Sequence, residues 1–372
     1  MKHKKIIATM MAIAMIIGAT CGFSSPAAAT MTVEDGVTQS VESWFMDNYG
    51  QYYDIIDEEF TITRTHDNGG TTNYTVSVYC QTKLKSQNPE SLPYVRGLYD
   101  AVEARRNANV YSASAETAID DYVSTLDITD DYNILTMDVV VEVSNSPATR
   151  SLASFALYYQ DGMNTQLHPI EDVELDSNEM YLHGLADAAP IIEEYSQNAS
   201  MISTRGYSSY DRIAARDYAF NWTGSSVTNC YDHGYTCGML QDRSKWNNDS
   251  YYFIDTLTHS DCADFVSQCM YAGGIPIEPG KWQRFLDADY GWTWTYVPSL
   301  RNYMVDKGYW DTSSFYWANA GNILYWNDSS HIALITLNDG VTNRFTAHTN
   351  DRYNYVFYDS TGYNYYAIDI SD

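Results

Sequence analysis

The sequence predicts an α+β protein, and two observations carry this prediction. Apolar residues recur at helical spacing in several stretches, as Val37, Val41, Trp44 and Phe45 do near the N-terminus. Other stretches alternate apolar and polar residues between turn-forming residues, which is the pattern of half-buried antiparallel strands. Because helices and strands come in separate runs rather than in strict alternation, the pattern favours α+β over a parallel α/β fold.

The first unit spans residues 30–195 and is expected to form a curved antiparallel sheet over helices. Helices are predicted at 33–48, 92–105, 116–126 and 182–195, and strands at 61–65, 73–83, 132–143 and 151–159. The turn Asp67-Asn68-Gly69-Gly70 tolerates positive φ and predicts a hairpin. This unit holds no catalytic constellation, and its histidines are expected at the surface: His66, His168 and His183.

A polar stretch of small residues, 196–209, predicts a linker before the second unit, 210–372. That unit is expected to begin with a helix at 210–222 and to contain another at 297–307. Apolar runs at 323–326, 332–337 and 345–347 are separated by Asn- and Asp-containing turns. They predict consecutive antiparallel strands.

A cysteine stands in the first turn of a predicted helix in the stretch Thr258–Gly274. We expect Ser260 or Asp261 to cap this helix through its side chain, Asp264 to add negative charge that the helix dipole favours, and Gly273-Gly274 to end it. The free N–H groups at a helix N-terminus stabilise a thiolate, so Cys262 is expected to be a nucleophile with a lowered pKa. Alternatively, Cys262 is a small apolar core residue or one half of a disulfide.

Three segments in this order resemble the bacterial putative amidase domain family: Tyr210–Trp222, Asp261–Gly274, and His331–Thr336 with Ala347–Asp351. The resemblance runs from about Tyr207 to the C-terminus. The family is similar to the NlpC-type cell-wall peptidases and belongs to the papain-like cysteine hydrolases. It therefore implies a helix packed on an antiparallel sheet and hydrolysis of amide bonds without metal or organic cofactor, with peptidoglycan peptides as the leading substrate.

The resemblance implies a catalytic residue in each of three places. Cys262 is the expected nucleophile and His331, at the start of a predicted strand, the expected base. His348 lies on the next strand, from which it is expected to orient His331, with Asn350 or Asp351 as the fallback. The backbone N–H of Cys262 is expected to stabilise part of the oxyanion charge. His259, on the loop before the helix, could line the cleft, but the resemblance assigns it no role.

The N-terminal residues 1–29 have the three parts of a secretory signal: Lys2, Lys4 and Lys5, an apolar run, and Ala27-Ala28-Ala29. Cleavage after Ala29 is expected, which makes the protein exported and soluble; lipidation at Cys21 is disfavoured by the preceding Thr20. Removal of the signal leaves 18 basic residues against 48 acidic ones and takes the formal charge from −27 to −30. Because binding to the phosphate backbone needs a basic surface, this charge balance excludes nucleic-acid binding as a main activity. The sequence leaves the oligomeric state open.

A rival prediction is a protein that has the same fold but no enzymatic activity. The tryptophans between Trp282 and Trp326 are numerous enough to form an aromatic cleft that holds a peptide or glycan in a non-enzymatic extracellular module. Burial in the domain core is the ordinary alternative for each of them.

Five cysteines remain after signal removal, so at least one is unpaired within the chain. Cys80 is expected in a buried strand, and Cys269 lies on the same helix as Cys262, too far away to bridge to it. Cys230 and Cys237 bracket a short loop that a disulfide would close. With His233 they offer three zinc ligands, but no fourth follows at metal spacing.

We predict a disulfide between Cys230 and Cys237 in the exported protein. Closing so short a loop should add about 2 kcal/mol to the free energy of unfolding. The intact mass of the protein after alkylation, with and without prior reduction, shows whether the disulfide is present. Two alkylated thiols on that peptide under oxidising conditions would contradict the bridge.

Overall fold

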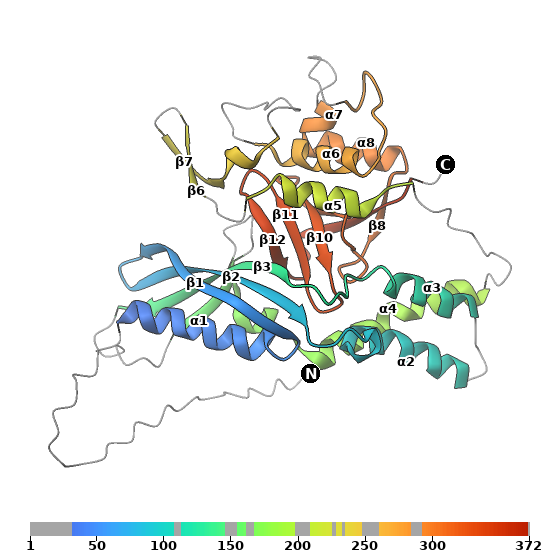
Figure 1. Ribbon diagram of the computed structural model, residues 1–372, viewed down its shortest axis with the longest axis horizontal. Coiled ribbons are helices and arrows are strands. Elements are labelled where there is room, and N and C mark those ends of the chain that lie inside the picture. The colour runs from blue at the N-terminus through green and yellow to red at the C-terminus, as the bar shows by residue number, and fades with distance from the viewer. Residues whose placement is uncertain are drawn as a thin grey trace, which may run out of the picture.

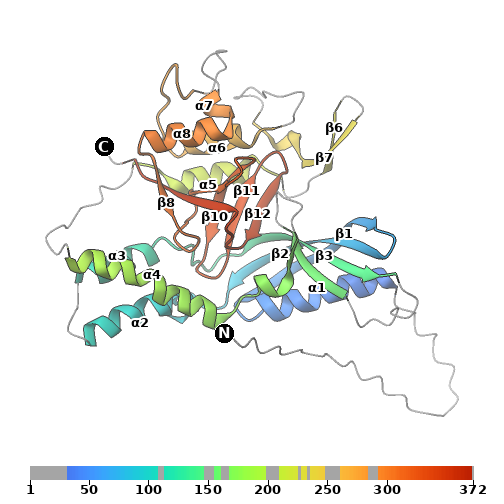
Figure 2. The same cartoon turned by 180° about the vertical axis from the view of Figure 1, so that it is seen from behind.

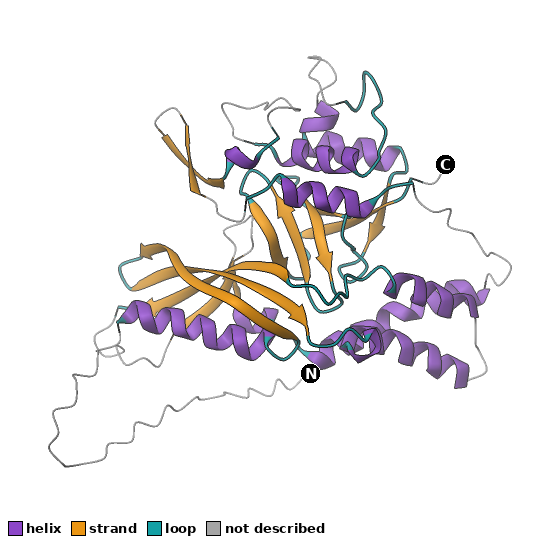
Figure 3. Cartoon of the chain, viewed as in Figure 1, coloured by secondary structure: helices purple, strands orange, loops and turns teal. Residues whose placement is uncertain are grey.

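The structure is a computed structural model that describes residues 32–107, 113–145, 155–160, 167–197, 209–224, 228–232, 235–247, 260–283 and 292–370. In residues 194–197, 228–232 and 235–240 the description covers the backbone alone. Helices and antiparallel strands occur in separate runs, which confirms the predicted α+β class (Figures 1 and 3).

The N-terminal half contains these elements: α1 (Val33–Tyr49), β1 (Tyr53–Asp67), β2 (Thr71–Leu84), η1 (Pro89–Ser91), α2 (Pro93–Asn107), α3 (Ala113–Val123), β3 (Asn133–Ser144), β4 (Phe155–Gln160), β5 (Leu167–Pro169), η2 (Ile170–Val173) and α4 (Ser177–Gln197). A capping box begins α1, since Thr32 Oγ1 accepts from the Asp35 N–H at 3.1 Å and Asp35 Oδ2 from the Thr32 N–H at 3.0 Å. The predicted hairpin is confirmed, with Gly69 at φ 79° in its turn.

The C-terminal half contains these elements: α5 (Arg212–Asn221), β6 (Thr228–Asp232), β7 (Tyr235–Gln241), η3 (Arg243–Lys245), α6 (Cys262–Ala272), α7 (Trp292–Thr295), α8 (Val297–Asp306), β8 (Trp310–Ser313), β9 (Ile323–Trp326), β10 (Ile332–Asn338), β11 (Asn343–Ala347), β12 (Arg352–Phe357) and β13 (Tyr363–Ile368). The helices and three strands predicted for this half are confirmed. The loop expected between Cys230 and Cys237 is instead the hairpin β6–β7, and β8, β12 and β13 were not predicted.

Strands of both halves join one sheet in the order β1-β2-β3-β12-β11-β10-β9-β13-β8, with β4 and β5 branching from β3. All its pairs among the described residues are antiparallel except β3 with β12, which meet at Thr136 and Tyr355. Figures 1 and 2 show α5, α6 and α8 above the C-terminal strands, α1 beneath β1–β3, and α2, α3 and α4 grouped beside it. The predicted division at 196–209 stays a prediction.

The C-terminal sheet is buried on both faces. Along β10, Ile332 and Leu334 belong to the core under α5, α6 and α8, whereas Ala333 and Ile335 belong to a core shared with the N-terminal half. The alternation follows from the two-residue period of a strand. The C-terminal sheet thus carries the candidate site on one face and the N-terminal half on the other.

Arg344 of β11 is one of the buried polar links between the halves, with its side chain fully covered. Its guanidinium donates to Ile134 O at 2.9 Å and to Thr82 Oγ1 at 3.0 Å, and lies 3.6 Å from Asp339 Oδ2. A buried guanidinium is tolerated only when its donors are matched in this way.

Arg344→Met should therefore lower the free energy of unfolding by about 3 kcal/mol, because it removes the donor to Ile134 O and Thr82 Oγ1 and leaves the buried carboxyl of Asp339 without its positively charged partner. Urea denaturation measures the loss. Lys83→Met is the control: its ion pair is with Asp130, whose side chain is 80% exposed, and its loss should cost about 1 kcal/mol or less. Equal losses in the two variants would contradict a structural role for Arg344.

Candidate active site

Helix α6 begins at Cys262 and is enclosed by the rest of the C-terminal half. Every residue from Cys262 to Met270 is buried, including the predicted apolar face, and Cys262 itself is 3% exposed. Gly274, at φ 99°, follows the helix as predicted. The cysteine therefore stands at a helix N-terminus inside the protein rather than on an open surface.

Asp261 precedes Cys262 and is held at two points by the end of β11. Its N–H donates to Thr349 Oγ1 at 2.7 Å, and its Oδ2 lies 2.7 Å from His348 Nδ1. The expected side-chain cap is wrong for Asp261, whose carboxyl makes no capping bond. Ser260 Oγ instead lies 3.9 Å from Cys262 Sγ. The position of the cysteine is thus set by contacts from a strand distant in sequence.

Thr349 makes one of these contacts from a strained backbone. Its φ is 86°, in a region that β-branched residues rarely adopt. Strain of this kind persists where surrounding contacts fix it, and it is found at functional sites. Here the contacts are the bond from the Asp261 N–H and the bond from Gln241 Nε2 to Thr349 O at 2.9 Å.

His348 is enclosed between two aromatic rings and has both ring nitrogens occupied. Its ring stacks on Phe265, with centroids 3.8 Å apart, and on Trp246 at 4.7 Å. Nε2 lies 2.8 Å from the carbonyl oxygen of Trp222. Because a carbonyl only accepts, Nε2 carries a proton.

The proton on Nε2 fixes how His348 and Asp261 share a second proton. Either a neutral carboxyl donates to Nδ1, or a charged Nδ1–H donates to a carboxylate. Burial raises the pKa of Asp261 to about 8 and lowers the pKa of His348. Both shifts favour the neutral pair, in which the carboxyl of Asp261 donates its proton to His348 Nδ1. In the charged arrangement, too, a single proton lies between these two side chains.

His331 stands apart from this pair. Its ring meets Trp326 edge-on, with centroids 4.9 Å apart, and its Nε2 is buried without a hydrogen-bond partner among the described residues. Burial, followed by the charge of Arg352, lowers the pKa of His331 to about 3. The bond expected from His348 to His331 is not formed within the described part of the chain, because Asp261 and Trp222 occupy both nitrogens of His348.

The Cys262 thiol does not have the lowered pKa that its helix position predicted. Burial raises the pKa of Cys262, while Ser260 and the N–H groups of Ala263 and Ile332 act in the opposite direction. Desolvation therefore outweighs the helix N-terminus, and the resting group is a thiol. The influence of the Ile332 N–H places the sulfur beside the start of β10, one residue from His331.

Asp264 is also neutral rather than the charged residue expected from the dipole. It accepts from Gln268 Nε2 at 2.8 Å and from Trp294 Nε1. Burial and the neighbouring Asp261 raise the pKa of Asp264 well above its ordinary value. A carboxyl enclosed by apolar rings keeps its proton because the charged form loses its hydration.

Asp351, the fallback residue, supports the site from behind His348. It accepts from the Asp242 N–H at 2.8 Å and from Trp246 Nε1 at 3.0 Å, so it fixes one of the rings that cover His348. Trp246, Thr349 and the Trp222 carbonyl were not predicted. Thr349 lies within the segment Ala347–Asp351 that carried the resemblance, so this segment could have indicated a role for Thr349 in the site.

Three of the tryptophans that could form the aromatic cleft of the rival prediction are buried instead. Trp282, Trp294 and Trp326 are at most 1% exposed, whereas Trp292 is 62% exposed. Trp282 and Trp294 pack on each other with centroids 4.5 Å apart. They serve the core around α6, which is the ordinary alternative stated above.

Two predicted features fall outside the described part of the chain: His259, and the side chains of Cys230, His233 and Cys237 with their disulfide or zinc alternatives. Among the described residues, no group of three or more His, Cys, Asp or Glu side chains is arranged to hold a metal ion. Cys80, Cys262 and Cys269 are free and buried.

The candidate site lies wholly within the segment that carried the resemblance. Residues 209–370 match the family model of the putative amidase domain. The predicted recognition is thereby confirmed for the C-terminal half, and the match indicates hydrolysis of amide bonds. Searches of curated proteins and of solved structures found no match. In the described part of the amidase domain and of the N-terminal half, no helix is long and apolar enough to cross a membrane.

Thr349→Val should destabilise the amidase domain by about 1–3 kcal/mol, because the buried Asp261 N–H loses its acceptor. Valine is β-branched like threonine, so the backbone strain is matched. Thr349→Ser keeps the oxygen and should cost less. Urea denaturation compares the two; equal stability would show that the hydroxyl has no part in holding Asp261.

The pH dependence of stability should reveal His331. An unfolded chain protonates this residue below its ordinary pKa of 6.5, whereas the folded state resists protonation down to about 3. Stability is therefore lost as pH falls through this window, by about 2 kcal/mol between pH 7 and pH 5. Asp261, with its raised pKa, opposes the trend, since its contribution falls as pH rises from 3.8 to about 8.

The test compares wild type with His331→Gln by urea denaturation at both pH values. The contribution of Asp261 is common to the two proteins and cancels in the comparison. His331→Gln should remove the share of the loss that His331 causes. His348, whose pKa burial also lowers, keeps its share in both proteins. The same change at the exposed His66 should leave the whole loss in place. An unchanged loss in His331→Gln would mean that other groups cause it.

Proposed function

We propose that this protein is a secreted bacterial cysteine hydrolase with a papain-like C-terminal domain that cleaves amide bonds in peptidoglycan peptides. The observation that carries the proposal is the place of Cys262: it begins helix α6 within the amidase match, with its sulfur beside the start of β10. A sulfur at a helix N-terminus has backbone N–H groups nearby, which suit an oxyanion that forms on attack.

His331 is the proposed base. Its buried Nε2 lacks a partner among the described residues, and burial keeps the imidazole neutral in the resting site. An unpaired buried polar atom costs about 1–3 kcal/mol, which a hydrogen bond to the reacting thiol would offset. His348 is less suited to this role, because both of its nitrogens are occupied.

The reaction then proceeds in two halves. His331 Nε2 takes the thiol proton as the Cys262 sulfur bonds to the amide carbonyl carbon, and the proton passes to the nitrogen as the C–N bond breaks and the amine leaves. Water attacks the resulting thioester, giving one proton to His331. The carboxylic acid departs as the S–C bond breaks, and that proton returns to the sulfur.

His348 serves the proposed site through Asp261 rather than through His331. Its bond to Asp261 and the bond from Asp261 to Thr349 fix the residue before the nucleophile. Peptide substrates from the cell wall follow from the resemblance to NlpC-type peptidases, and export follows from the N-terminal signal pattern. The alternative, a non-enzymatic binding module, needs an exposed aromatic cleft. The burial of Trp282, Trp294 and Trp326 counts against it.

Cys262→Ala and His331→Ala should each abolish turnover, because nucleophile and base act as one unit. His348→Ala should leave partial activity, since its role is positioning. Mass spectrometry of muropeptides measures the products. Wild type should release new amino termini without new reducing sugar ends, because a thiol attacks a carbonyl whereas glycosidic cleavage ordinarily uses paired carboxylates.

Cys269→Ala is the matched control, since Cys269 is a second buried cysteine on α6 and should be dispensable for turnover. Circular dichroism checks that each variant is folded. Full activity in Cys262→Ala would disprove the cysteine mechanism, and reducing ends without amino termini would disprove amide hydrolysis.

A further inference from the structure

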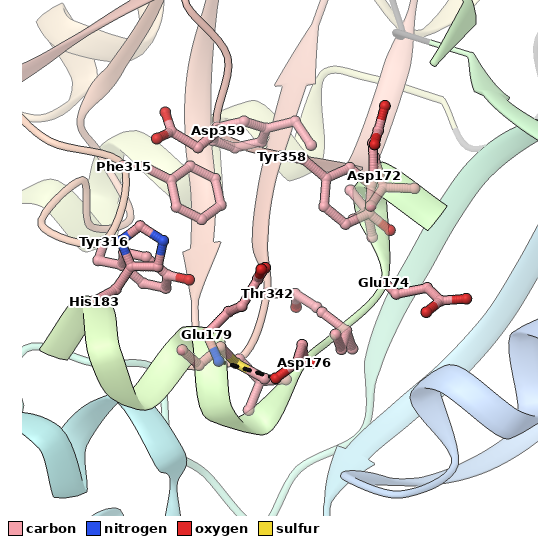
Figure 4. A pocket seen from close by; sticks show the side chains of 16 residues that line it. Asp172, Glu174, Asp176, Glu179, His183, Phe315, Tyr316, Thr342, Tyr358 and Asp359 are labelled. Carbon is pink, nitrogen blue, oxygen red and sulfur yellow. Dashed lines mark hydrogen bonds between the residues drawn. The ribbon is translucent and has the colours of Figure 1, made fainter. Parts of the chain in front are cut away.

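A cavity of about 160 Å³ lies between the two halves, on the face of the C-terminal sheet away from α6. The segment from η2 to α4 forms one side, and the residues around β11, β12 and the chain before β9 form the other. Figure 4 shows Phe315, Tyr316 and Tyr358 around it with Thr342 between them. No residue of α6 lines this cavity, so it is separate from the candidate active site.

The aromatic walls are held in place by their neighbours. Tyr316 stacks on Tyr94 with ring centroids 4.2 Å apart, and Phe315 meets Phe357 edge-on at 5.5 Å. The hydroxyl of Tyr358 is hydrogen-bonded to that of Tyr49. A rigid aromatic wall costs little entropy when a ligand binds and attracts cations through the ring face.

Five carboxylates and one histidine line the cavity beside its aromatic walls, and the ring of His183 lies 5.3 Å from that of Tyr316. The acidic lining residues are Asp172, Glu174, Asp176, Glu179 and Asp359. All five are exposed at the surface, as is His183, and no lysine or arginine lines the cavity. The cavity therefore has aromatic rings in its wall and carboxylates at its mouth.

The charges of these acids reach into the cavity. Burial raises the pKa of Tyr316, and the charges of Asp187, Asp359 and Glu179 raise it further. The pKa of Glu174 is raised by burial and by the neighbouring Glu171 and Asp176. Burial is the larger cause of both shifts, and the charges of the neighbouring acids add to it.

We propose that this cavity binds an organic cation: a primary amine on a short aliphatic chain. The chain would lie against the aromatic rings, and the ammonium group would meet Glu179 and Asp359. A cavity of about 150 Å³ holds a molecule the size of benzene, which suits a chain of about five carbons. Aromatic walls favour this ligand over a metal ion, and the described residues form no metal-binding cluster.

Calorimetric titration of the full protein tests the proposal with 1,5-diaminopentane and with Nα-acetyl-lysine methylamide; 1,5-pentanediol is the neutral control. Saturable one-site binding of at least one amine is expected, with no binding of the diol. Glu179→Gln and Asp359→Asn should each weaken binding at least tenfold. Glu42→Gln is the matched control, because it removes the same charge from an exposed site on α1 and should leave binding unchanged.

Stronger binding of the diamine would identify a free amine as the ligand, and stronger binding of the lysine derivative a peptide side chain; either supports the site. No binding to folded wild type would overturn the proposal. So would equal binding to all three variants, which would mean general attraction to an acidic surface. Cys262→Ala should bind as wild type does, so this test stands apart from that of the amidase.

Discussion

The hydrogen bond between Asp261 and His348 ties the candidate active site to the C-terminal sheet. It joins the residue before Cys262 to the end of β11, and Thr349 adds a second bond from the same strand end. The ring of His348 is covered by Phe265 and Trp246, so the bond is sheltered from water. A bond in such surroundings is costly to break, because each polar group would then be buried without a partner.

The same burial sets the protonation of the whole site. Asp261 and Asp264 have raised pKa values and His331 a lowered one, in each case because desolvation penalises the charged form. Cys262 follows the same rule and rests as a thiol. Burial therefore favours neutral groups throughout the site, so the proposed mechanism begins with proton transfer from thiol to imidazole and not with a preformed ion pair.

The two halves of the chain share a sheet and a core, and the two faces of the C-terminal strands have different surroundings. One face of the C-terminal strands packs under α5, α6 and α8 and holds Cys262. The other face packs on the N-terminal half, where Arg344 is matched by Thr82 and Ile134. The acidic cavity lies on this second side. Binding there would bridge the halves without touching the nucleophile.

Local sequence determined the elements whose signals are short-range. The helix at 33–48, the turn at 67–70 and the helix that starts at Cys262 depend on neighbouring residues, so they could be predicted. The amidase segments were recognisable for the same reason. Strands β12 and β13 were missed because their tyrosine-rich stretches lack a clear alternation of apolar and polar residues.

Tertiary structure alone decided the partners and protonation of the site residues. Asp261 and His348 lie 87 residues apart, and no local pattern indicates that a predicted cap instead bonds to a distant histidine. The pKa of Cys262 depends on how much water the packed chain excludes, a quantity that helix position does not contain. The sequence thus determined which residues are candidates for the chemistry, and packing decided which of them meet, because contact and desolvation arise only when distant segments come together.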